Sequence, residues 1–394
     1  MKIVVLADDL TGAAELGGIG YRFGFRAGVS LEICPADFYE MSVIDTNTRC
    51  FPPHRAKSVV YDMATQVTAH DNPWIYKKVD SVLRGPVLAE IEGILSALRK
   101  QRAFLAPANP SKGRVIRDGL YYTDGKPIDQ TSFAQDPINP IRSSEVLQIL
   151  GISSGEPVFL RRPGESIPSR GIVVCEASSK EDLQFWAANL DETTLAAGGA
   201  EFFEAILGTM ETPTPPIRDN SLIHSCSRSL VVSGSALRDD PLKFKLFDSH
   251  QIPVVFMPKE LSQDDGSNVV RCVQDWTEAT RKVLKQRGQA VVAIGLPVLP
   301  DSSAPEKLSA WMARLVVAIV NENLVDHVLI EGGSTASEIV RRLSWTHLTV
   351  VQEWAPGVIS LRPKTSQSTD SPRLTLKPGS YPWPGELLRT LQRN

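Results

Sequence analysis

Two aspartates, Asp8 and Asp9, directly follow an apolar run in the opening stretch "MKIVVLADDLTGAAE". Carboxylate oxygens accept hydrogen bonds, so an adjacent pair suits a ligand with several hydroxyl groups. The β-branched run predicts a buried parallel strand, and the small residues after it predict a closely packed helix with Thr11 as its N-cap. The aspartates would then lie at the carboxyl end of a strand, where open α/β sheets bind ligands. The plainer alternative is two exposed loop residues, one of which caps the helix.

A second polar group lies in "WIYKKVDSVLRGPVLAEIEGIL", residues 74–95. The alternation predicts a strand with Lys78 and Asp80 on one face, followed by Ser81 and Arg84 and then by an amphipathic helix from Val87. Arginine is suited to bidentate binding of a carboxylate or a phosphate. A solvated sheet edge with ordinary surface ion pairs is the alternative.

A third stretch, "FLAPANPSKGRVIRDGLYYTDGKPI", continues the pattern of an apolar strand followed by a polar loop. Asp124 and Gly125 predict a hairpin turn farther along. The loop after the strand is suited to binding an anion through its polar, cationic and glycine residues, which are Asn109, Ser111, Lys112, Gly113 and Arg114.

The second half of the chain carries strands that end in small residues, in "SLVVSGSALRDD", "HVLIEGGSTASEIVRRLS" and "LTLKPGSYPWPGE". Glycine lets backbone N–H groups approach an anion, and a helix N-terminus adds a favourable dipole. The repeated unit predicts a nucleotide-phosphate site, although the P-loop motif GxxxxGK[ST] is absent. The alternative is that the Gly-Gly and Gly-Ser pairs only form tight turns. The candidate residues are Ser233, Gly234, Ser235, Gly332, Gly333, Ser334, Thr335, Lys377 and Gly379.

The length of 394 residues predicts two domains, and the proline-rich stretch "METPTPPIRDN" reads as a linker between them. We therefore expect domains over 1–215 and 216–394. Each is expected to be an α/β domain with a largely parallel sheet flanked by helices, and the active site is expected in a cleft between them.

Composition limits the class of protein further. A net charge of -3 argues against a nucleic-acid partner, and no segment approaches the roughly 20 apolar residues of a membrane span. Five scattered cysteines and a short, interrupted apolar start favour a reducing, cytoplasmic location without a signal peptide. The six histidines show no metal-ligand spacing, so no protein-held metal is expected.

Together, "ADDLTGAAE", "KKVDSVLRG" and "APANPSKGR" resemble the signature blocks of the four-carbon acid sugar kinases. The resemblance implies that the first domain binds a threonate, erythronate or 3-oxo-tetronate substrate and that the second binds ATP with Mg²⁺. The γ-phosphoryl group would pass to a terminal hydroxyl, with Arg84 on the substrate carboxylate and Lys78 nearby. Asp8, Asp9 and Asp80 would bind hydroxyls, with Asp9 or Asp80 as the base. The remaining substrate-binding candidates are Ser81, Asn109, Gly113 and Arg114.

Two other functions stay open from the sequence. A sensor that binds sugar acids without ATP would fit the departures from the family pattern in the second half, such as Ser334 where an acidic residue is usual. An NAD-dependent dehydrogenase would fit the α/β pattern, but GxGxxG is missing. If the chain associates with itself, a homodimer is the commonest symmetric form.

Overall fold

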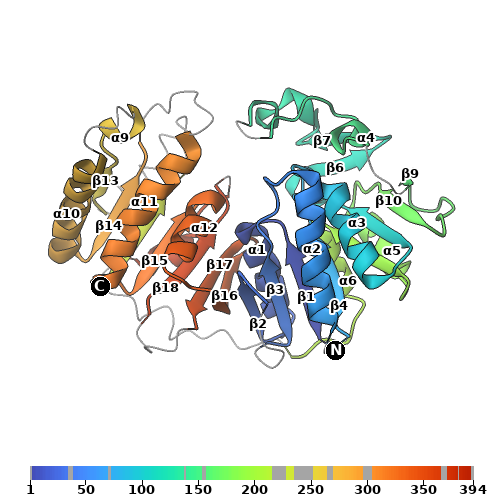
Figure 1. Ribbon diagram of the computed structural model, residues 1–394, viewed down its shortest axis with the longest axis horizontal. Coiled ribbons are helices and arrows are strands. Elements are labelled where there is room, and N and C mark those ends of the chain that lie inside the picture. Colours follow the sequence, from blue (N-terminus) through green and yellow to red (C-terminus); the bar gives the residue numbers. More distant parts are fainter. Residues whose placement is uncertain are drawn as a thin grey trace. The chain divides into compact units, whose positions relative to one another are not determined.

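The chain divides into two compact units, Met1–Pro215 (unit 1) and Pro216–Asn394 (unit 2). A computed structural model describes residues 2–33, 39–69, 72–136, 139–152, 157–214, 228–234, 252–263, 269–295, 304–364, 371–379 and 381–391. Figure 1 colours unit 1 from blue to yellow-green and unit 2 from yellow to red. Helices lie against the strands of a sheet in each unit, so both are α/β structures.

The main sheet of unit 1 is parallel throughout. Its strands are β1 (Ile3–Ala7), β2 (Ala27–Ser30), β3 (Met41–Asp45), β4 (Trp74–Lys78), β5 (Arg102–Ala106), β9 (Val158–Arg161), β10 (Gly171–Cys175) and β11 (Thr194–Gly198). They lie in the order β2-β3-β1-β4-β11-β5-β10-β9. Because β1, β4 and β5 run in the same direction near the middle of the sheet, the polar residues after them meet at one edge.

Helices cover both faces of this sheet. They are α1 (Leu10–Arg22), α2 (Pro53–Thr68), α3 (Val87–Leu98), α5 (Lys180–Ala188) and α6 (Ala200–Leu207). One face packs Val4, Leu6 and Ile75 against α2 and α3. On the other face the Tyr76 ring lies 4.9 Å from that of Phe203 in α6. Side chains alternate between the faces along β4, so its two lysines point in opposite directions.

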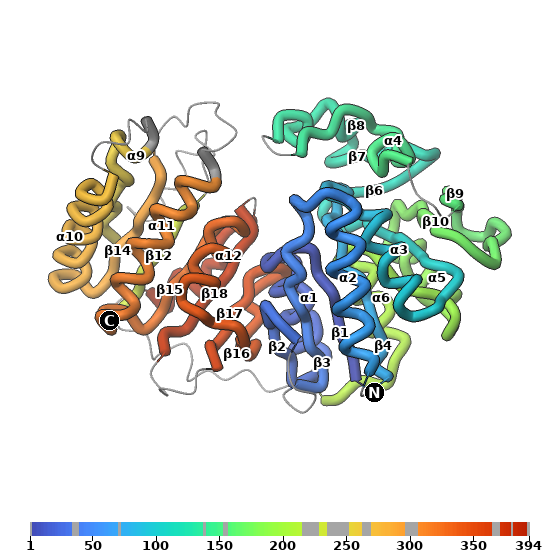
Figure 2. Tube along the Cα trace, viewed as in Figure 1, coloured from blue at the N-terminus to red at the C-terminus, as the bar shows by residue number. Residues whose placement is uncertain are grey.

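A small second sheet lies in the connection between β5 and β9. Its strands are β6 (Arg114–Arg117), β7 (Leu120–Thr123) and β8 (Lys126–Pro127), and a short helix, α4 (Val146–Ile149), follows it. The predicted turn joins β7 to β8, because Asp124 and Gly125 adopt φ angles of 50° and 76°. The Tyr121 hydroxyl donates to the Ser81 carbonyl oxygen at 2.5 Å, which ties this sheet to the carboxyl end of β4. In Figure 2 the small sheet lies at the end of unit 1 that is away from the chain N-terminus.

Unit 2 has its own, mixed sheet. Its strands are β12 (Ser229–Ser233), β13 (Val254–Phe256), β14 (Gln289–Ala293), β15 (His327–Glu331), β16 (His347–Ala355), β17 (Val358–Pro363) and β18 (Arg373–Lys377). The order is β13-β14-β12-β15-β18-β17-β16, parallel from β13 to β18 and antiparallel from β18 to β16. The expected fold class, largely parallel α/β, is confirmed, and the antiparallel β16–β17 pair is an addition.

The helices in the described residues of unit 2 are α9 (Glu260–Gln263), α10 (Val269–Arg287), α11 (Ala304–Asn321), α12 (Gly333–Arg342) and α13 (Gly385–Arg389). Within the parts of both units that the structure describes, no helix has the length and apolar character needed to cross a bilayer. The helix that matters for the site is α12, because it begins directly after the central strand β15.

We expect the stability of unit 2 to fall as the solution becomes mildly acidic, because His327 is buried. Its ring shares a 2.7 Å hydrogen bond with the Thr375 hydroxyl, and burial, helped by the charge of Arg373, lowers the pKa of His327 to about 3. The unfolded chain titrates near pH 6.5, so unfolding takes up a proton between about pH 6.5 and 3. His327→Gln should lose this dependence in urea titrations at pH 7, 5 and 4. Equal pH slopes for both proteins would contradict it.

Candidate active site

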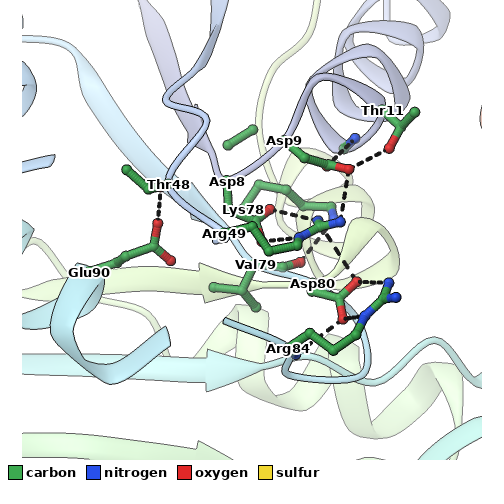
Figure 3. Close-up of polar contacts among 12 residues, drawn as sticks. Asp8, Asp9, Thr11, Thr48, Arg49, Lys78, Val79, Asp80, Arg84 and Glu90 are labelled. Atoms are coloured by element: carbon green, nitrogen blue, oxygen red, sulfur yellow. Dashed lines mark hydrogen bonds and ion pairs between the residues drawn. The ribbon is translucent and has the colours of Figure 1, made fainter. Parts of the chain in front are cut away.

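The two aspartates after β1 are held by an arginine from a distant part of the chain, Arg49 (Figure 3). Its Nε and Nη2 donate to the two carboxylate oxygens of Asp8 at 2.8 and 3.0 Å, and its Nη1 donates to Asp9 at 2.8 Å. The Asp8 side chain is 1% exposed. One guanidinium therefore fixes both carboxylates, and charge-assisted bidentate contacts of this kind are among the strongest hydrogen bonds in proteins.

Asp9 also begins helix α1. Its extended backbone and its carboxylate, which accepts from the Gly12 N–H at 2.8 Å, make it the N-cap. The expectation that Thr11 is the cap is wrong, because Thr11 already lies in the helix and its hydroxyl donates to Asp9 at 2.6 Å. Burial raises the pKa of Asp9, but the positive charges of Arg49 and Lys78 outweigh it and lower the pKa overall.

Arg49 and the two aspartates that it holds form the first clamp of the site. Asp80 and Arg84 form a second clamp just beyond β4. Arg84 donates from Nε and Nη2 to the two Asp80 oxygens at 2.8 and 2.9 Å, and from Nη1 to Asp136 at 2.8 Å. Burial raises the pKa of Asp80, but Arg84 and Arg49 more than offset this and hold it far below its usual range. Asp80 is thus ionised, and the Arg84 guanidinium holds two carboxylates.

Lys78 lies on the α1 side of the sheet, as its alternation with Lys77 requires. Its Nζ donates to the Val79 carbonyl oxygen at 2.9 Å and lies 3.9 Å from the carboxylate of Glu15. Lys112, in the loop after β5, donates to the same carboxylate at 2.9 Å. Glu15 therefore neutralises two lysines. Burial raises its pKa, but Lys112 and Lys78 lower it overall.

The loop after β5 brings the third group of predicted residues to the same edge. Asn109 is buried, and its Oδ1 accepts from the Glu201 N–H at 3.2 Å. Gly113 has a φ of 65°, and a Cβ there would meet the Asp124 carboxylate at 2.3 Å, so the turn requires glycine. The turn directs Arg114 back to the site, where its Nη1 donates to the Ser81 hydroxyl at 2.6 Å.

A buried charge pair supports this site from the α3 side. Lys77 Nζ lies 3.0 Å from the Glu90 carboxylate, and both side chains are at most 1% exposed. The Thr48 hydroxyl donates to Glu90, and Thr48 directly precedes Arg49 (Figure 3). Burial raises the pKa of Glu90, and although Lys77 opposes this, the overall shift is upward. The pair therefore anchors the loop that presents Arg49.

Sequence reasoning missed Arg49 and Asp136, which complete the two clamps. Arg49 comes shortly after strand β3, in "DTNTRCFPP", where no recognisable motif surrounds it. The only signal for Arg49 was its position shortly after β3, the strand that pairs with β1, because ligands bind at the carboxyl ends of such strands. Asp136 offered no such signal, because it reaches Arg84 through the irregular connection that follows β8.

A cavity of about 750 Å³ opens beside the two clamps in unit 1. Among the described residues its lining includes three arginines, which are Arg49, Arg84 and Arg142, and no acidic side chain. The aspartates themselves are not part of this lining. The positive lining favours an anionic ligand next to the carboxylate cluster.

In unit 2 the predicted phosphate-site residues gather at the carboxyl ends of β12, β15 and β18. Ser233 and Gly234 follow β12, and Ser235 lies outside the described residues. Gly332, with a φ of 107°, is the N-cap of α12 and has no side-chain cap, so the first N–H groups of the helix stay available to an anion. The residues of its first turn include Gly333, Ser334 and Thr335.

Lys377 is buried at the end of β18 and faces its own loop. Its Nζ donates to the carbonyl oxygens of Pro378 and Tyr381 at 3.1 and 2.5 Å, and it lies 3.4 Å from Glu331. Gly379 belongs to the same loop. In this arrangement the ammonium group stabilises the loop beside α12, and nothing in these contacts directs it toward a phosphate.

Two sequence families match the chain over most of its length. Residues 3–206 match the sugar-binding N-terminal domain family, and residues 247–381 match the nucleotide-binding C-terminal domain family. The first match spans all of the clamps described above. The second spans the glycine-rich start of α12 and Lys377.

Characterised proteins show the same relationship. The D-threonate kinase of Salmonella typhimurium is 33% identical, over 97% of this chain and 95% of its own length. The D-erythronate kinase of Heliobacterium modesticaldum is 29% identical over 46% of each chain, and the 3-oxo-tetronate kinase of Brucella melitensis is 21% identical over 91% of this chain and 88% of its own. The chain therefore belongs to the four-carbon acid sugar kinase family, whose members are phosphotransferases.

Solved structures share the fold. A crystal structure from Salmonella typhimurium, provisionally labelled a tRNA synthase, superposes with a TM-score of 0.75 at 16% identity over 99% of this chain and 98% of that one. A Haemophilus influenzae protein gives 0.67 at 17% identity over 98% of both chains. At these identities the likeness establishes the fold alone.

Proposed function

We propose that this protein transfers the γ-phosphoryl group of ATP to the terminal hydroxyl of threonate, erythronate or 3-oxo-tetronate. The observation that carries the proposal is the set of three aspartates, Asp8, Asp9 and Asp80, clamped by Arg49 and Arg84 within the sugar-binding match. Sugar hydroxyls are donors, and these carboxylates are acceptors fixed before the substrate arrives. Preorganised acceptors need not reorient as the substrate binds.

The aspartates would orient the attacking hydroxyl and accept its proton. The Asp9 side chain is 20% exposed, against 1% for Asp8 and 8% for Asp80. Asp9 is therefore the most accessible acceptor of the three, which favours it over Asp80 as the base. Its lowered pKa keeps it ionised at neutral pH, and loose phosphoryl transfer needs positioning more than a strong base.

Unit 2 is proposed to bind ATP. The start of α12 fits the phosphate groups, because the N–H groups of its first turn have no side-chain cap and no Cβ obstructs the approach at Gly332. The Ser233 hydroxyl is buried and has no hydrogen-bond partner among the described residues, so it can donate to a bound nucleotide. Mg²⁺ would arrive with ATP, held mainly by phosphate oxygens and water, and would neutralise charge on the migrating group.

The test is ATP consumption with Mg²⁺ against D- and L-threonate, D- and L-erythronate and their 3-oxo forms. Turnover of one acid by the wild type names the substrate. Asp9→Asn should then lower kcat by about 100-fold or more, as expected for loss of a general base. Arg84→Ala should also abolish most activity, because Asp80 loses its clamp. Arg55→Met, an exposed arginine with no carboxylate contact in the described residues, serves as the matched control. ATP binding without turnover of any of these acids would contradict the proposed substrate.

A further inference from the structure

The basic side chains around the aspartates of unit 1 differ in one respect. Among the described residues, five of these side chains have a carboxylate within ion-pair distance. They are Arg49, Lys77, Lys78, Arg84 and Lys112. Arg114 is the exception: in the same residues its guanidinium has a hydroxyl partner, Ser81, and no carboxylate. Within this described group, the positive charge without a carboxylate partner thus lies at the start of β6.

Arg114 is nevertheless inside the cluster. Its hydrogen bond goes to Ser81, the residue next to Asp80, and its guanidinium carbon lies 5.5 Å from the centre of the Phe133 ring. The guanidinium of Arg84 lies 5.8 Å from the same ring. Arg114 therefore lies beside the Asp80 clamp, and its guanidinium and that of Arg84 both lie over the Phe133 ring.

Its backbone is fixed as firmly as its side chain. The Arg114 N–H donates to the Asn109 carbonyl oxygen at 3.1 Å, and the Asn109 N–H donates back to Arg114 at 2.8 Å. Phe133 and Ser81 hold one side of the guanidinium, whose fork has five donors, so most of its N–H groups are uncommitted. A half-buried, preoriented guanidinium with free donors is a binding group for a carboxylate.

Arg84, the carboxylate-binding residue expected from the sequence, is less suited to that task. It would have to weaken its contacts with Asp80 or Asp136 to receive a third carboxylate. Breaking a desolvated charge pair is unfavourable because it leaves an uncompensated charge. Arg84 acts instead on Asp80, whose orientation and ionisation it maintains.

We propose that Arg114 binds the carboxylate of the sugar acid and so determines that the substrate is an acid and not a neutral polyol or amide. This inference rests on the proposed function, whose substrate class it refines. Ser81 has a positioning role, because its hydroxyl orients the guanidinium. Arg142 is the rival: it lines the cavity and has no ion pair among the described residues, but it is exposed and has no contact with the aspartate clamps there.

The experiment measures binding by calorimetry in the absence of ATP, so that it does not depend on turnover. The probes are D-threonate, D-erythronate and 3-oxo-tetronate, each compared with its primary amide, which has a similar shape but no charge. The proteins are the wild type, Arg114→Gln, Arg114→Lys, Ser81→Ala, Arg84→Gln and Arg142→Gln. Thermal unfolding of each variant establishes that it is folded.

Arg114→Gln should weaken binding of the acid by roughly 10- to 100-fold while changing amide binding little, so the preference for the acid collapses. Arg114→Lys should recover part of the preference, and Ser81→Ala should reduce it a few-fold. Equal weakening of acid and amide by Arg114→Gln would overturn the proposal, as would loss of the preference in Arg84→Gln or Arg142→Gln alone. A wild type that binds the acid without phosphorylating it would contradict the proposed function only, whereas binding of none of the acids would contradict both.

Discussion

Replacing Arg49 by methionine is expected to lower kcat/KM by at least 1,000-fold and to destabilise unit 1 by about 3–5 kcal/mol. Arg49 donates to Asp8 and Asp9 and lies 3.8 Å from Asp80, so the variant leaves three clustered carboxylates without their shared counter-charge. Mutual repulsion would move the carboxylates out of the geometry that binds hydroxyls. Methionine keeps most of the apolar length of arginine, so the loss reports charge and hydrogen bonding more than volume.

The pH dependence of this variant separates electrostatics from packing. Without Arg49, repulsion and burial would raise the pKa of Asp9 and Asp80, so the folded state would be penalised most at neutral pH and less once these two carboxylates can take up protons. The deficit in unfolding free energy against the wild type should therefore shrink as the pH falls from 7 toward 4. Urea titrations across this range measure it, with Arg55→Met as the control for loss of a surface arginine. A deficit that is constant with pH, or activity within ten-fold of the wild type, would contradict the assigned role.

Glu90→Ala is expected to destabilise unit 1 by about 3–5 kcal/mol, because it leaves the ammonium group of Lys77 buried and unpaired. Both side chains are essentially inaccessible, and the Thr48 hydroxyl that donates to Glu90 would lose its acceptor as well. Activity should fall as well, since the Thr48 contact anchors the loop that carries Arg49. Denaturant unfolding gives the stability, and residual ATP turnover gives the second effect.

Two further variants decide between a buried charge pair and simple loss of side-chain volume. Lys77→Met combined with Glu90→Leu removes both charges together and should be much less destabilised than Glu90→Ala, because no unpaired charge remains. The matched control is Lys57→Met, which breaks the ion pair between α2 and Glu92 of α3. The Lys57 side chain is 45% exposed, so its loss should cost less than about 1 kcal/mol. A double variant as unstable as the single one would show that packing around Glu90, and not charge, is responsible.

The position of the site within unit 1 followed from local sequence. Asp8, Asp80 and Asn109 each come just after a predicted strand, and parallel strands place their carboxyl ends at one edge, so the three groups had to meet there. The alternation along β4 also placed Lys77 and Lys78 on opposite faces, as found. These features depend on patterns within about ten residues, which any single sequence displays.

The partners of those groups depend on contacts that no local pattern records. Arg49 meets Asp8 across 41 positions of sequence, and Arg84 meets Asp136 across 52. Arg84 and Arg114 look alike in sequence, since each is an arginine in a loop after a strand. Tertiary structure alone distinguishes them, because it commits Arg84 to two carboxylates and leaves Arg114 with a hydroxyl. The strength of an ion pair depends on the distance between side chains in three dimensions, which the sequence does not display. The sequence therefore determined which residues gather at the sheet edge. The tertiary structure decided which of their charges stay available to a ligand.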